Sequence, residues 1–427
     1  MSGVSYHGRD CVGVPSISPV PDTGLYNPVI APHKDDPFPY FRWARDHEPM
    51  VFHPVLGAYL VTRYETVKRV AGDPRRFSSR YSLPIHIDMQ PPEVAEILAE
   101  VGDATSVLVE ADGAEHTRLR EIWLRMLHGT RINKLRPRIA ELAVSLAAEI
   151  TDRGRADLVA EFAQPLVLTV VGELLGIPPA ERDQVYGYAF DGLIWANPMA
   201  PLADRVAAAR RHVAAEDYFR ELRDRCRAQP RDDLVSMLAI MDDLPGTPLS
   251  QSDFTSVIRQ FYGAGVDTSR DTITSTVWSM LSEGWWAKAV ADRSLIPDAV
   301  EETLRRDAPH RGLLRTTTED VVLDGVALPA GSRLLLLFGS ANRDERRFAE
   351  PDSFDPARDD VRAHVAFGHG PHACIGAHLA RTEARLAVEV LTRRLPDLKP
   401  ADGYEPSYVG NFFFRGLERL DVSWKAT

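Results

Sequence analysis

A glycine-rich loop around one of only three cysteines constrains this chain more than any other feature. The loop at 367–376 places Gly368, Gly370 and Gly376 around Cys374 and runs directly into an amphipathic helical pattern. Because glycine lacks a Cβ and permits positive φ, such a loop can approach a flat partner closely. The following helix would point its free N–H groups and positive dipole end at the sulfur, which favours thiolate over thiol. The pattern therefore indicates a thiolate bound to a metal.

Zinc and haem iron both suit a cysteine in this setting. His369, His372, Cys374 and His378 are all zinc-ligand types within ten residues, and structural zinc takes four nitrogen or sulfur ligands. Against zinc, no second pair of cysteines supplies the usual half-site. A single thiolate on a glycine loop facing a large planar cofactor fits haem better, because one axial cysteine is sufficient there.

The loop resembles the haem-ligand signature of the cytochrome P450 family, the haem-thiolate monooxygenases. Every fixed position of that signature is filled, by Phe367, Gly368, Gly370, His372, Cys374 and Gly376. The resemblance implies haem b as cofactor, with Cys374 as the axial metal ligand. It also implies a mainly α fold with small β-sheets (α+β), in which a long central helix crosses a buried haem.

Local patterns along the chain agree with a helix-rich fold. Helices are predicted near 38–47, 65–71, 112–127 and 252–284, and almost continuously over 132–243. Alternating apolar residues predict a hairpin at 50–62 and short strands over 321–337. The 80–112 region is mostly irregular, and so long an irregular segment usually has a functional reason.

The predicted helix at 252–284 carries a second motif. Phe261, Gly265 and Thr268 are spaced to lie on one helical face. A glycine inside a helix costs about 1 kcal/mol relative to alanine. Gly265 therefore needs a reason, such as room for another molecule beside the helix.

The residues next to that glycine have both a structural and a catalytic interpretation. Thr268 could bond to a carbonyl of its own helix, and Asp267 could simply be exposed. The stretch from Ala264 to Thr268 nevertheless resembles the acid–alcohol pair of the family's oxygen-activating helix. The resemblance implies catalytic roles for Asp267 and Thr268, and cofactor contact at Ala264 and Gly265.

Two further motifs resemble the family's propionate-binding residues. His116 and Arg120 lie four residues apart on one face of the predicted 112–127 helix. Two solvated polar residues would be the simpler interpretation. In the family such a His-x-x-x-Arg pair holds a haem propionate, and Arg315 corresponds to a second propionate-binding arginine. Gly and Ala stand at 113 and 114, where two prolines are common in the family.

Glu302 and Arg305 fall three residues apart in a predicted helix. An exposed ion pair would contribute little to stability, but the apolar residues around these two predict a partly buried helix. The resemblance implies the family's Glu-x-x-Arg pair, completed by Arg358. Its expected role is structural, because it would hold the cysteine loop in place.

The substrate pocket is predicted from apolar and aromatic residues that the resemblance brings near the haem. They are Ile85, Ile87, Phe261, Tyr262, Leu313, Leu314, Phe412 and Phe413. Aromatic residues of this kind usually belong to a core, but in the family the turn that carries the last two enters the pocket. These residues predict a largely apolar small organic substrate, without indicating which molecule it is or where it is oxidised.

The resemblance also implies partners. The acid–alcohol pair favours dioxygen and two electrons over peroxide. No flavin or iron–sulfur pattern follows the predicted haem domain, so a separate ferredoxin and its reductase are expected to supply the electrons. Arg118, Arg125 and Arg131 are hypothetical contributors to a basic docking face. A haem protein that senses or carries a gas is the alternative, for which Asp267 and Thr268 would be unnecessary.

Composition limits the remaining possibilities. The 427 residues contain no Ser/Gly linker, so a single domain at 36–427 is predicted after a proline-rich extended arm at 1–35. The net charge of −11 argues against nucleic acid or an anionic membrane as a partner. The three scattered cysteines suit a reducing compartment, and the first residues show no apolar run of signal or anchor length. We therefore expect a cytoplasmic protein.

Overall fold

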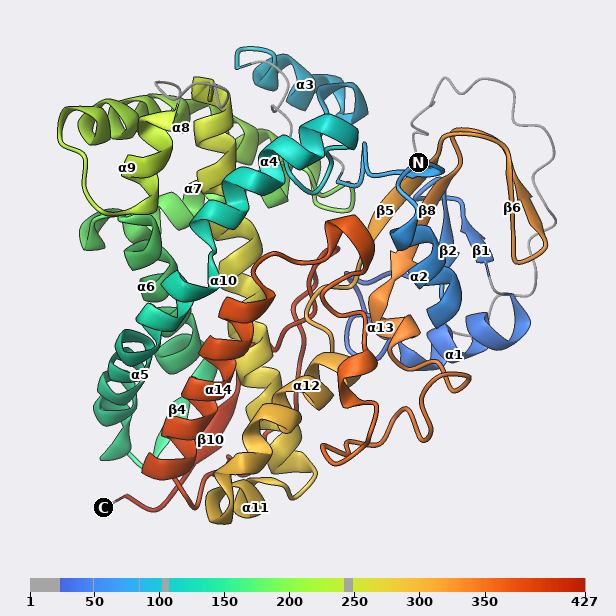
Figure 1. The fold of residues 1–427 in the computed structure, drawn as a ribbon. Coiled ribbons are helices and arrows are strands. Elements are labelled where there is room, and N and C mark those ends of the chain that lie inside the picture. Colours follow the sequence, from blue (N-terminus) through green and yellow to red (C-terminus); the bar gives the residue numbers. More distant parts are fainter. Residues whose placement is uncertain (1–23, 49, 84, 102–106, 242–248, 427) are drawn as a thin grey trace.

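The chain folds into a helix-rich body with small sheets at one side (Figure 1). The computed structural model describes residues 24–48, 50–83, 85–101, 107–241 and 249–426. The helices are α1 (Phe38–His47), α2 (Tyr64–Gly72), α3 (Pro92–Leu98), α4 (Gly113–Met126), α5 (Gly129–Thr151), α6 (Gln164–Leu175), α7 (Arg182–Trp195), α8 (Leu202–Ala228), α9 (Leu234–Ala239), α10 (Gln251–Ser282), α11 (Trp286–Ala291), α12 (Ile296–Arg306), α13 (Phe338–Ala341) and α14 (Ala377–Arg394). The predicted helices near 38–47, 65–71, 112–127 and 252–284 are confirmed by α1, α2, α4 and α10.

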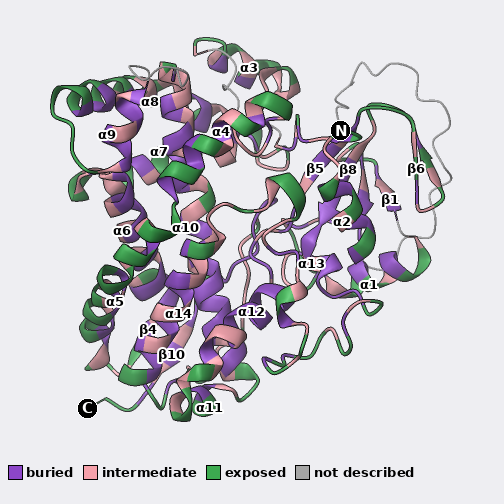
Figure 2. Cartoon of the chain, viewed as in Figure 1, coloured by how far each residue is buried: buried purple, intermediate pink, exposed green. Residues whose placement is uncertain are grey.

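Helix α10 is the central element of the helical part. It begins with a capping box, in which Ser250 and Asp253 each bond to the other's backbone N–H. Helices α6, α7, α12 and α14 pack around it. Figure 2 shows that these inner helices are largely buried, whereas the outer faces of α5 and α8 are exposed. A helix surrounded in this way can place residues on opposite faces into two different environments.

The sheets lie mainly on the other side of the molecule (Figure 1). The strands are β1 (Met50–His53), β2 (Ala58–Val61), β3 (Phe77–Ser78), β4 (Arg155–Asp157), β5 (Gly312–Thr317), β6 (Val321–Leu323), β7 (Val326–Leu328), β8 (Arg333–Leu337), β9 (Lys399–Pro400) and β10 (Asp421–Ser423). The main sheet has the order β1-β2-β8-β5-β3, with β2 and β8 parallel and the other pairs antiparallel. The pairing of β1 with β2 confirms the predicted hairpin.

The predicted helical region at 132–243 also contains a strand, β4. Its three residues pair with β10, close to the end of the chain. So short a strand carries no periodic signal of its own, because its pairing depends on a segment more than 250 residues away. This contact fixes the last strand beside the helical part.

The predicted arm is only partly described, because residues 1–23 lie outside the described ranges. Residues 24–35 form turns against α1 and the first hairpin. Tyr26 and His33 are both buried, and their rings pack against Tyr40. The Tyr26 carbonyl accepts a hydrogen bond from His53 at 2.8 Å. This end of the arm is therefore part of the core.

No single helix in the described ranges is both long and apolar enough to cross a membrane. One bent pair of helical segments, Val159–Leu175 and Pro179–Trp195, meets the length and composition criteria only when its two arms are combined across a 120° bend.

Candidate active site

The loop before α14 has backbone conformations that glycine adopts far more readily than other residues. Gly368 and Gly370 have φ of +71° and +72°, in the region that side chains disfavour. A Cβ on Gly370 would also lie 2.6 Å from the Ala71 carbonyl oxygen. The Cys374 N–H donates to the Phe367 carbonyl at 2.8 Å and closes the loop. The sequence therefore fixes the position of the cysteine at the start of α14.

Cys374 is exposed by surface area because it opens onto an internal cavity, although it lies deep in the molecule. Burial raises the pKa of the Cys374 thiol, while the Gly376 and Ala377 amides and two arginines, Arg120 and Arg381, act to lower it. The helix start thus favours thiolate as expected, but burial has the larger effect. A bound metal cation would supply the missing positive charge, since a coordinated thiol is deprotonated.

The three histidines near Cys374 do not converge on it as zinc ligands would. His369 packs beside Gly72, His378 contacts Asn133 at 3.3 Å, and the ring of His372 lies 4.3 Å from the His116 ring, tilted against it. Within the described residues, no group of three or more histidine, cysteine or acidic side chains is arranged to hold a metal ion. This arrangement argues against zinc and leaves a single thiolate ligand.

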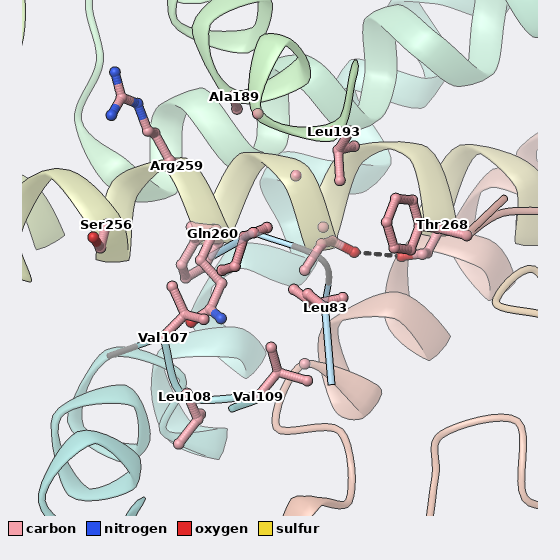
Figure 3. A pocket seen from close by; sticks show the side chains of 18 of the residues that line it. Leu83, Val107, Leu108, Val109, Ala189, Leu193, Ser256, Arg259, Gln260 and Thr268 are labelled. Carbon is pink, nitrogen blue, oxygen red and sulfur yellow. Dashed lines mark hydrogen bonds between the residues drawn. The ribbon is translucent and has the colours of Figure 1, made fainter. Parts of the chain in front are cut away.

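The cavity has a volume of about 670 Å³. We call the residues that line it the cavity wall. Many of the predicted site residues belong to the wall: Ile85, Ile87, Arg120, Phe261, Ala264, Gly265, Thr268, Leu313, Phe367, Gly368, His372, Cys374, Gly376 and Phe413. Figure 3 shows α10 crossing the cavity, with the segment at 107–109 on one side and Ala189 and Leu193 on the other. Segments distant in sequence therefore enclose the space beside Cys374.

A group of donors near the cavity has no anionic partner. Among the described residues, Arg120 and Arg315 donate only to backbone carbonyls, of Ala373 at 3.1 Å and of Leu314 at 2.7 Å. Among the described residues, His116 Nε2 has no hydrogen-bond partner, and no carboxylate forms an ion pair with either arginine. Two propionates on one edge of haem would satisfy such a group.

The pKa values of this group show how strongly it is desolvated. Burial lowers the pKa of Arg315 to about 10, with Asp112 acting in the opposite direction. Burial lowers the pKa of His372 to about 3, and the nearby Arg315 and His116 contribute to the shift. Buried cationic groups without a counter-ion are costly. The residues present therefore fit a dianionic cofactor edge, and haem meets that requirement.

Thr268 faces the cavity, and its hydroxyl donates to the Ala264 carbonyl at 2.6 Å (Figure 3). The bond within the helix that the simpler interpretation predicts is therefore formed. The same contact leaves the lone pairs of the Thr268 oxygen available toward the cavity.

Asp267 points away from the cavity. Its Oδ1 atom accepts hydrogen bonds from Tyr186 Oη and Arg270 Nη1, both at 2.7 Å. Arg270 also contacts Asp271 and Gln164. The acid and the alcohol are therefore adjacent in sequence but lie on different sides of α10. The sequence did not identify Tyr186, because a tyrosine on another helix carries no motif.

The predicted Glu302, Arg305 and Arg358 come together in the interior. Arg305 binds the Glu302 carboxylate through two nitrogens at 2.7 and 2.8 Å, and Arg358 Nε contacts it at 3.0 Å. Arg305 also donates to the carbonyls of Asn342, Pro351 and Ser353. This group ties α12 to the segment that leads to the cysteine loop.

A second carboxylate on α12 was missed from the sequence. The Glu301 carboxylate is buried and contacts Arg381 at 2.7 Å, Arg385 at 3.1 Å and His364 at 3.2 Å. Burial alone would raise the pKa of Glu301, but His364 and Arg381 hold it well below its usual value. Its partners lie on α14 and in the preceding loop. Glu301 therefore fixes the helix that follows Cys374.

Three predicted pocket residues lie elsewhere. Tyr262 is buried among the helices, in the core cluster that includes α10. Leu314 faces the opposite side of β5 from Leu313, because side chains alternate along a strand. Phe412 packs in the core beside the first hairpin, whereas Phe413 and Phe414 line the cavity. None of these three residues lines the cavity, although the sequence assigned them to the substrate pocket.

The cavity wall also contains polar residues that the sequence did not indicate. At the end formed by α8 and α10, Arg259 pairs with Glu216 at 2.6 Å and contacts His212 at 3.1 Å. Figure 3 shows Arg259 and Gln260 on α10 at some distance from Thr268. His310 lines the cavity as well. The wall is thus apolar over most of its surface, with polar groups at separate positions.

Comparison with known proteins agrees with this geometry. The cytochrome P450 family model matches residues 286–404. Cytochrome P450 107B1 of Saccharopolyspora erythraea is 35% identical over 371 residues, covering 86% of this chain and 89% of that protein. Cytochrome P450 monooxygenase PikC of Streptomyces venezuelae is 33% identical over 423 residues, covering 97% of this chain and 96% of that protein.

Solved structures agree with the fold. Full-length CYP116B46 from Tepidiphilus thermophilus matches 93% of this chain with a TM-score of 0.87 and 30% identity. This chain spans about half of that protein, 53% of its length. The match confirms the predicted mainly α fold with small sheets, and the relatives are named as P450 proteins and monooxygenases. The chain belongs to the cytochrome P450 family, and it is a haem-thiolate monooxygenase.

Proposed function

We propose that this monooxygenase holds haem b through Cys374 and oxidises a predominantly apolar small molecule. It uses dioxygen and two electrons from a separate ferredoxin and its reductase. One observation carries the proposal: the Cys374 sulfur and the Thr268 side chain open onto the same cavity. The buried donors without a counter-ion beside it support the same cofactor.

The chain's own residues bind and orient the cofactor. Haem with a thiolate ligand, when bound, activates dioxygen for transfer of one oxygen atom to a substrate. The Gly376 and Ala377 amides favour the negative charge on the Cys374 sulfur. His116, Arg120 and Arg315 would hold the two propionates. The apolar part of the wall excludes water, which strengthens these electrostatic interactions.

Thr268 and Asp267 move protons. The Thr268 hydroxyl accepts a hydrogen bond from water in the cavity while it donates to the Ala264 carbonyl. Rotation about its Cβ–Oγ1 bond turns the hydroxyl proton into the cavity, where it passes to an acceptor. Asp267, behind α10, takes up a proton from solvent once its side chain turns away from Tyr186 and Arg270, and passes it to the Thr268 oxygen. Positioned acid–base groups of this kind typically contribute about 100- to 10,000-fold to a rate.

The ferredoxin is proposed to bind a basic surface near the cysteine loop. Of the three arginines considered, Arg118 already pairs with Glu115 at 2.7 Å, and Arg131 lies 3.6 Å from Asp232. Arg125 is exposed at the end of α4. Arg125 is therefore the best candidate for contact with an acidic ferredoxin. Arg125→Glu should slow reduction at low salt, and an unchanged rate would remove Arg125 from the proposed surface.

The haem ligand is tested by the spectrum of the reduced, carbon-monoxide-treated protein. The wild type should absorb at the wavelength diagnostic of sulfur ligation. Cys374→Ser should lose that band while keeping its helical circular dichroism. Cys226→Ala, which changes a buried thiol in the helical core, should keep the band. A wild-type protein without the band would overturn the proposed cofactor site.

The proton-delivery role is tested by the fate of the electrons. Thr268→Ala should consume reductant but release more hydrogen peroxide and less product than the wild type. Thr268→Ser, which keeps a hydroxyl, should recover most of the coupling. Coupling in Thr268→Ala equal to that of the wild type would show that protons reach the cavity by another route.

A further inference from the structure

His310 is an isolated polar residue in an apolar part of the cavity wall. It lies between α12 and β5, and its neighbours in the wall include Leu313, Phe338 and Phe414. Its ring is 5.4 Å from the Phe414 ring, nearly perpendicular to it, and 6.2 Å from the Phe338 ring. By surface area His310 is half-buried, and it lines the internal cavity. The open part of the imidazole therefore faces the cavity.

The backbone around His310 is held firmly in place. His310 forms a bridge with Phe414, and the Arg311 N–H donates to the Phe413 carbonyl at 2.8 Å. On the other side, the Arg415 N–H donates to the Pro309 carbonyl at 2.8 Å. These contacts use backbone atoms only. They fix the position of the imidazole but give the ring no structural task.

Among the described residues, the imidazole itself has no hydrogen-bond partner. Its Nδ1 atom is closed off from the cavity and has no hydrogen bond among the described residues, so Nε2 is the ring nitrogen that a ligand in the cavity can reach. Burial lowers the pKa of His310 to about 4, and no charged group contributes to this shift. The ring is therefore neutral near pH 7, with one nitrogen as donor and the other as acceptor. A buried polar group left unpaired destabilises a fold, so such groups call for an explanation.

The charged residues that follow His310 and its bridge partner Phe414 in the sequence, Arg311 and Arg415, do not face the cavity. Arg311 donates to the carbonyls of Asn411 and Phe414, at 3.0 and 2.9 Å. Arg415 donates to the Lys34 carbonyl at 3.1 Å. Neither arginine lines the cavity. This part of the wall thus offers a ligand one neutral hydrogen-bonding group and no positive charge.

We propose that His310 is a substrate-binding residue, and that it hydrogen-bonds a neutral oxygen group, a hydroxyl or a carbonyl, on an otherwise apolar substrate. The inference rests on the proposed function and narrows its substrate class. The substrate carries its oxygen beside Leu313 and Phe414 while the rest of the molecule fills the apolar wall. A carboxylate is disfavoured there, because it would be buried against a neutral ring and aromatic side chains.

The test compares matched ligands that differ in one oxygen. Cyclododecane, cyclododecanol, cyclododecanone, adamantane and 2-adamantanone are titrated into the haem-loaded wild type and its variants, with the shift of the haem absorption as readout. Dodecanoic acid is the carboxylate probe. These probes form two series, one built on cyclododecane and one on adamantane. In at least one series, the wild type should bind the alcohol or ketone more tightly than the parent hydrocarbon. His310→Phe should reduce that preference by about tenfold, the usual weight of one buried hydrogen bond.

Two further variants separate a specific contact from a change of shape. His310→Gln keeps hydrogen-bonding atoms and should retain part of the preference. Leu313→Val changes the same part of the wall and should weaken both members of a pair equally. In the ligand-free protein, His310→Phe should raise the melting temperature, because it removes an unpaired polar group.

The proposal is overturned if no oxygenated probe binds the wild type better than its hydrocarbon. It is also overturned if His310→Phe keeps the full preference, or if dodecanoic acid depends on His310 more strongly than the neutral probes do. A normal sulfur-ligated carbon monoxide spectrum in the same samples shows that the haem site is intact. A failure of the His310 inference can therefore be distinguished from a failure of the proposed function.

Discussion

The cysteine side of the molecule and the cavity wall treat buried polar groups in opposite ways. On the cysteine side, which comprises α12, α14 and the loop between α13 and α14, Glu301 and Glu302 each accept several hydrogen bonds from arginines. In residues of the cavity wall, Trp195 Nε1, His212 Nδ1 and His310 Nδ1 have no hydrogen-bond partner among the described residues. Satisfied polar networks build a frame, whereas unpaired groups mark surfaces that await a ligand.

The largest expected effect comes from breaking the frame. Glu302→Ala would leave Arg305 and Arg358 buried without their anion, and should cost about 3–5 kcal/mol of stability. Urea unfolding of the haem-loaded protein, followed by circular dichroism and haem absorbance, measures the loss. The control is Asp298→Ala on the same helix, which breaks an exposed pair with Arg362 at 2.7 Å. It should cost less than about 1 kcal/mol.

If Glu302→Ala unfolded at the same urea concentration as Asp298→Ala, the buried group would not be part of the frame. The conclusion that paired buried carboxylates stabilise the cysteine side would then be wrong.

Glu383 on α14 is an exception on the cysteine side. Its two carboxyl oxygens have no hydrogen-bond partner within the described residues, and burial raises its pKa from 4.5 to about 8, with Ser269 acting in the opposite direction. Between these values the unfolded chain ionises while the folded protein stays protonated. Stability should therefore fall as pH rises through this window.

Replacing this carboxyl sharpens the comparison. Glu383→Gln cannot ionise, so near pH 8 it should be more stable than the wild type by on the order of 3 kcal/mol, since one pKa unit corresponds to about 1.36 kcal/mol. Near pH 5 the two proteins should differ little. Urea unfolding across this range measures the effect, with Glu389→Gln, a partly exposed position on α14, as control. An identical pH dependence in wild type and Glu383→Gln would show that Glu383 is ionised in the folded protein.

The same contrast explains how much could be predicted from the sequence. The cysteine loop, Glu302 with Arg305, and the α10 motif are short patterns whose geometry is local. Glycines at a tight turn, or two residues three apart on a helix, already determine which side chains meet. Arg358 was found because it belongs to a motif of its own. These predicted residues lie together in the structure.

The cavity wall was harder to predict, because it is assembled from distant segments. One residue of offset decides which side chain enters: Leu313 lines the cavity and Leu314 does not, as Phe413 does and Phe412 does not. Strand alternation and the exact course of the last turn set these directions, and neither is visible in an apolar sequence. The contact of Tyr186 with Asp267 depends likewise on how α7 packs on α10.

Tyr186 holds Asp267, the proposed acid on α10, and its own helix α7 also contributes to the cavity wall. Tyr186→Phe removes a hydrogen bond to a carboxylate and should cost about 1.5 kcal/mol of stability. It should also free Asp267 and change the kinetic solvent isotope effect on product formation. Tyr188→Phe, which removes a contact with Gln184 on the exposed side of the same helix, is the control.

The two variants have opposite expected outcomes. If Tyr186→Phe and Tyr188→Phe showed the same isotope effect as the wild type, Tyr186 would be a structural residue only. The positioning of Asp267 would then depend on Arg270 alone.

The smallest effect is expected at Tyr262, whose hydroxyl is buried without a hydrogen-bond partner among the described residues. Unlike His310, it lies in the helical core and not on the cavity wall. Tyr262→Phe should therefore leave ligand affinity unchanged. It should change stability by less than about 1 kcal/mol, and the expected direction is stabilisation, because the variant removes an unpaired polar group. Phe261→Leu is the matched comparison, because Phe261 lines the cavity and stacks on Trp123 at 5.2 Å. Phe261 reaches the cavity, whereas its neighbour Tyr262 does not. If Tyr262→Phe changed ligand affinity as much as Phe261→Leu, the Tyr262 hydroxyl would influence ligand binding from the core, and its burial in the core would not separate it from the cavity wall.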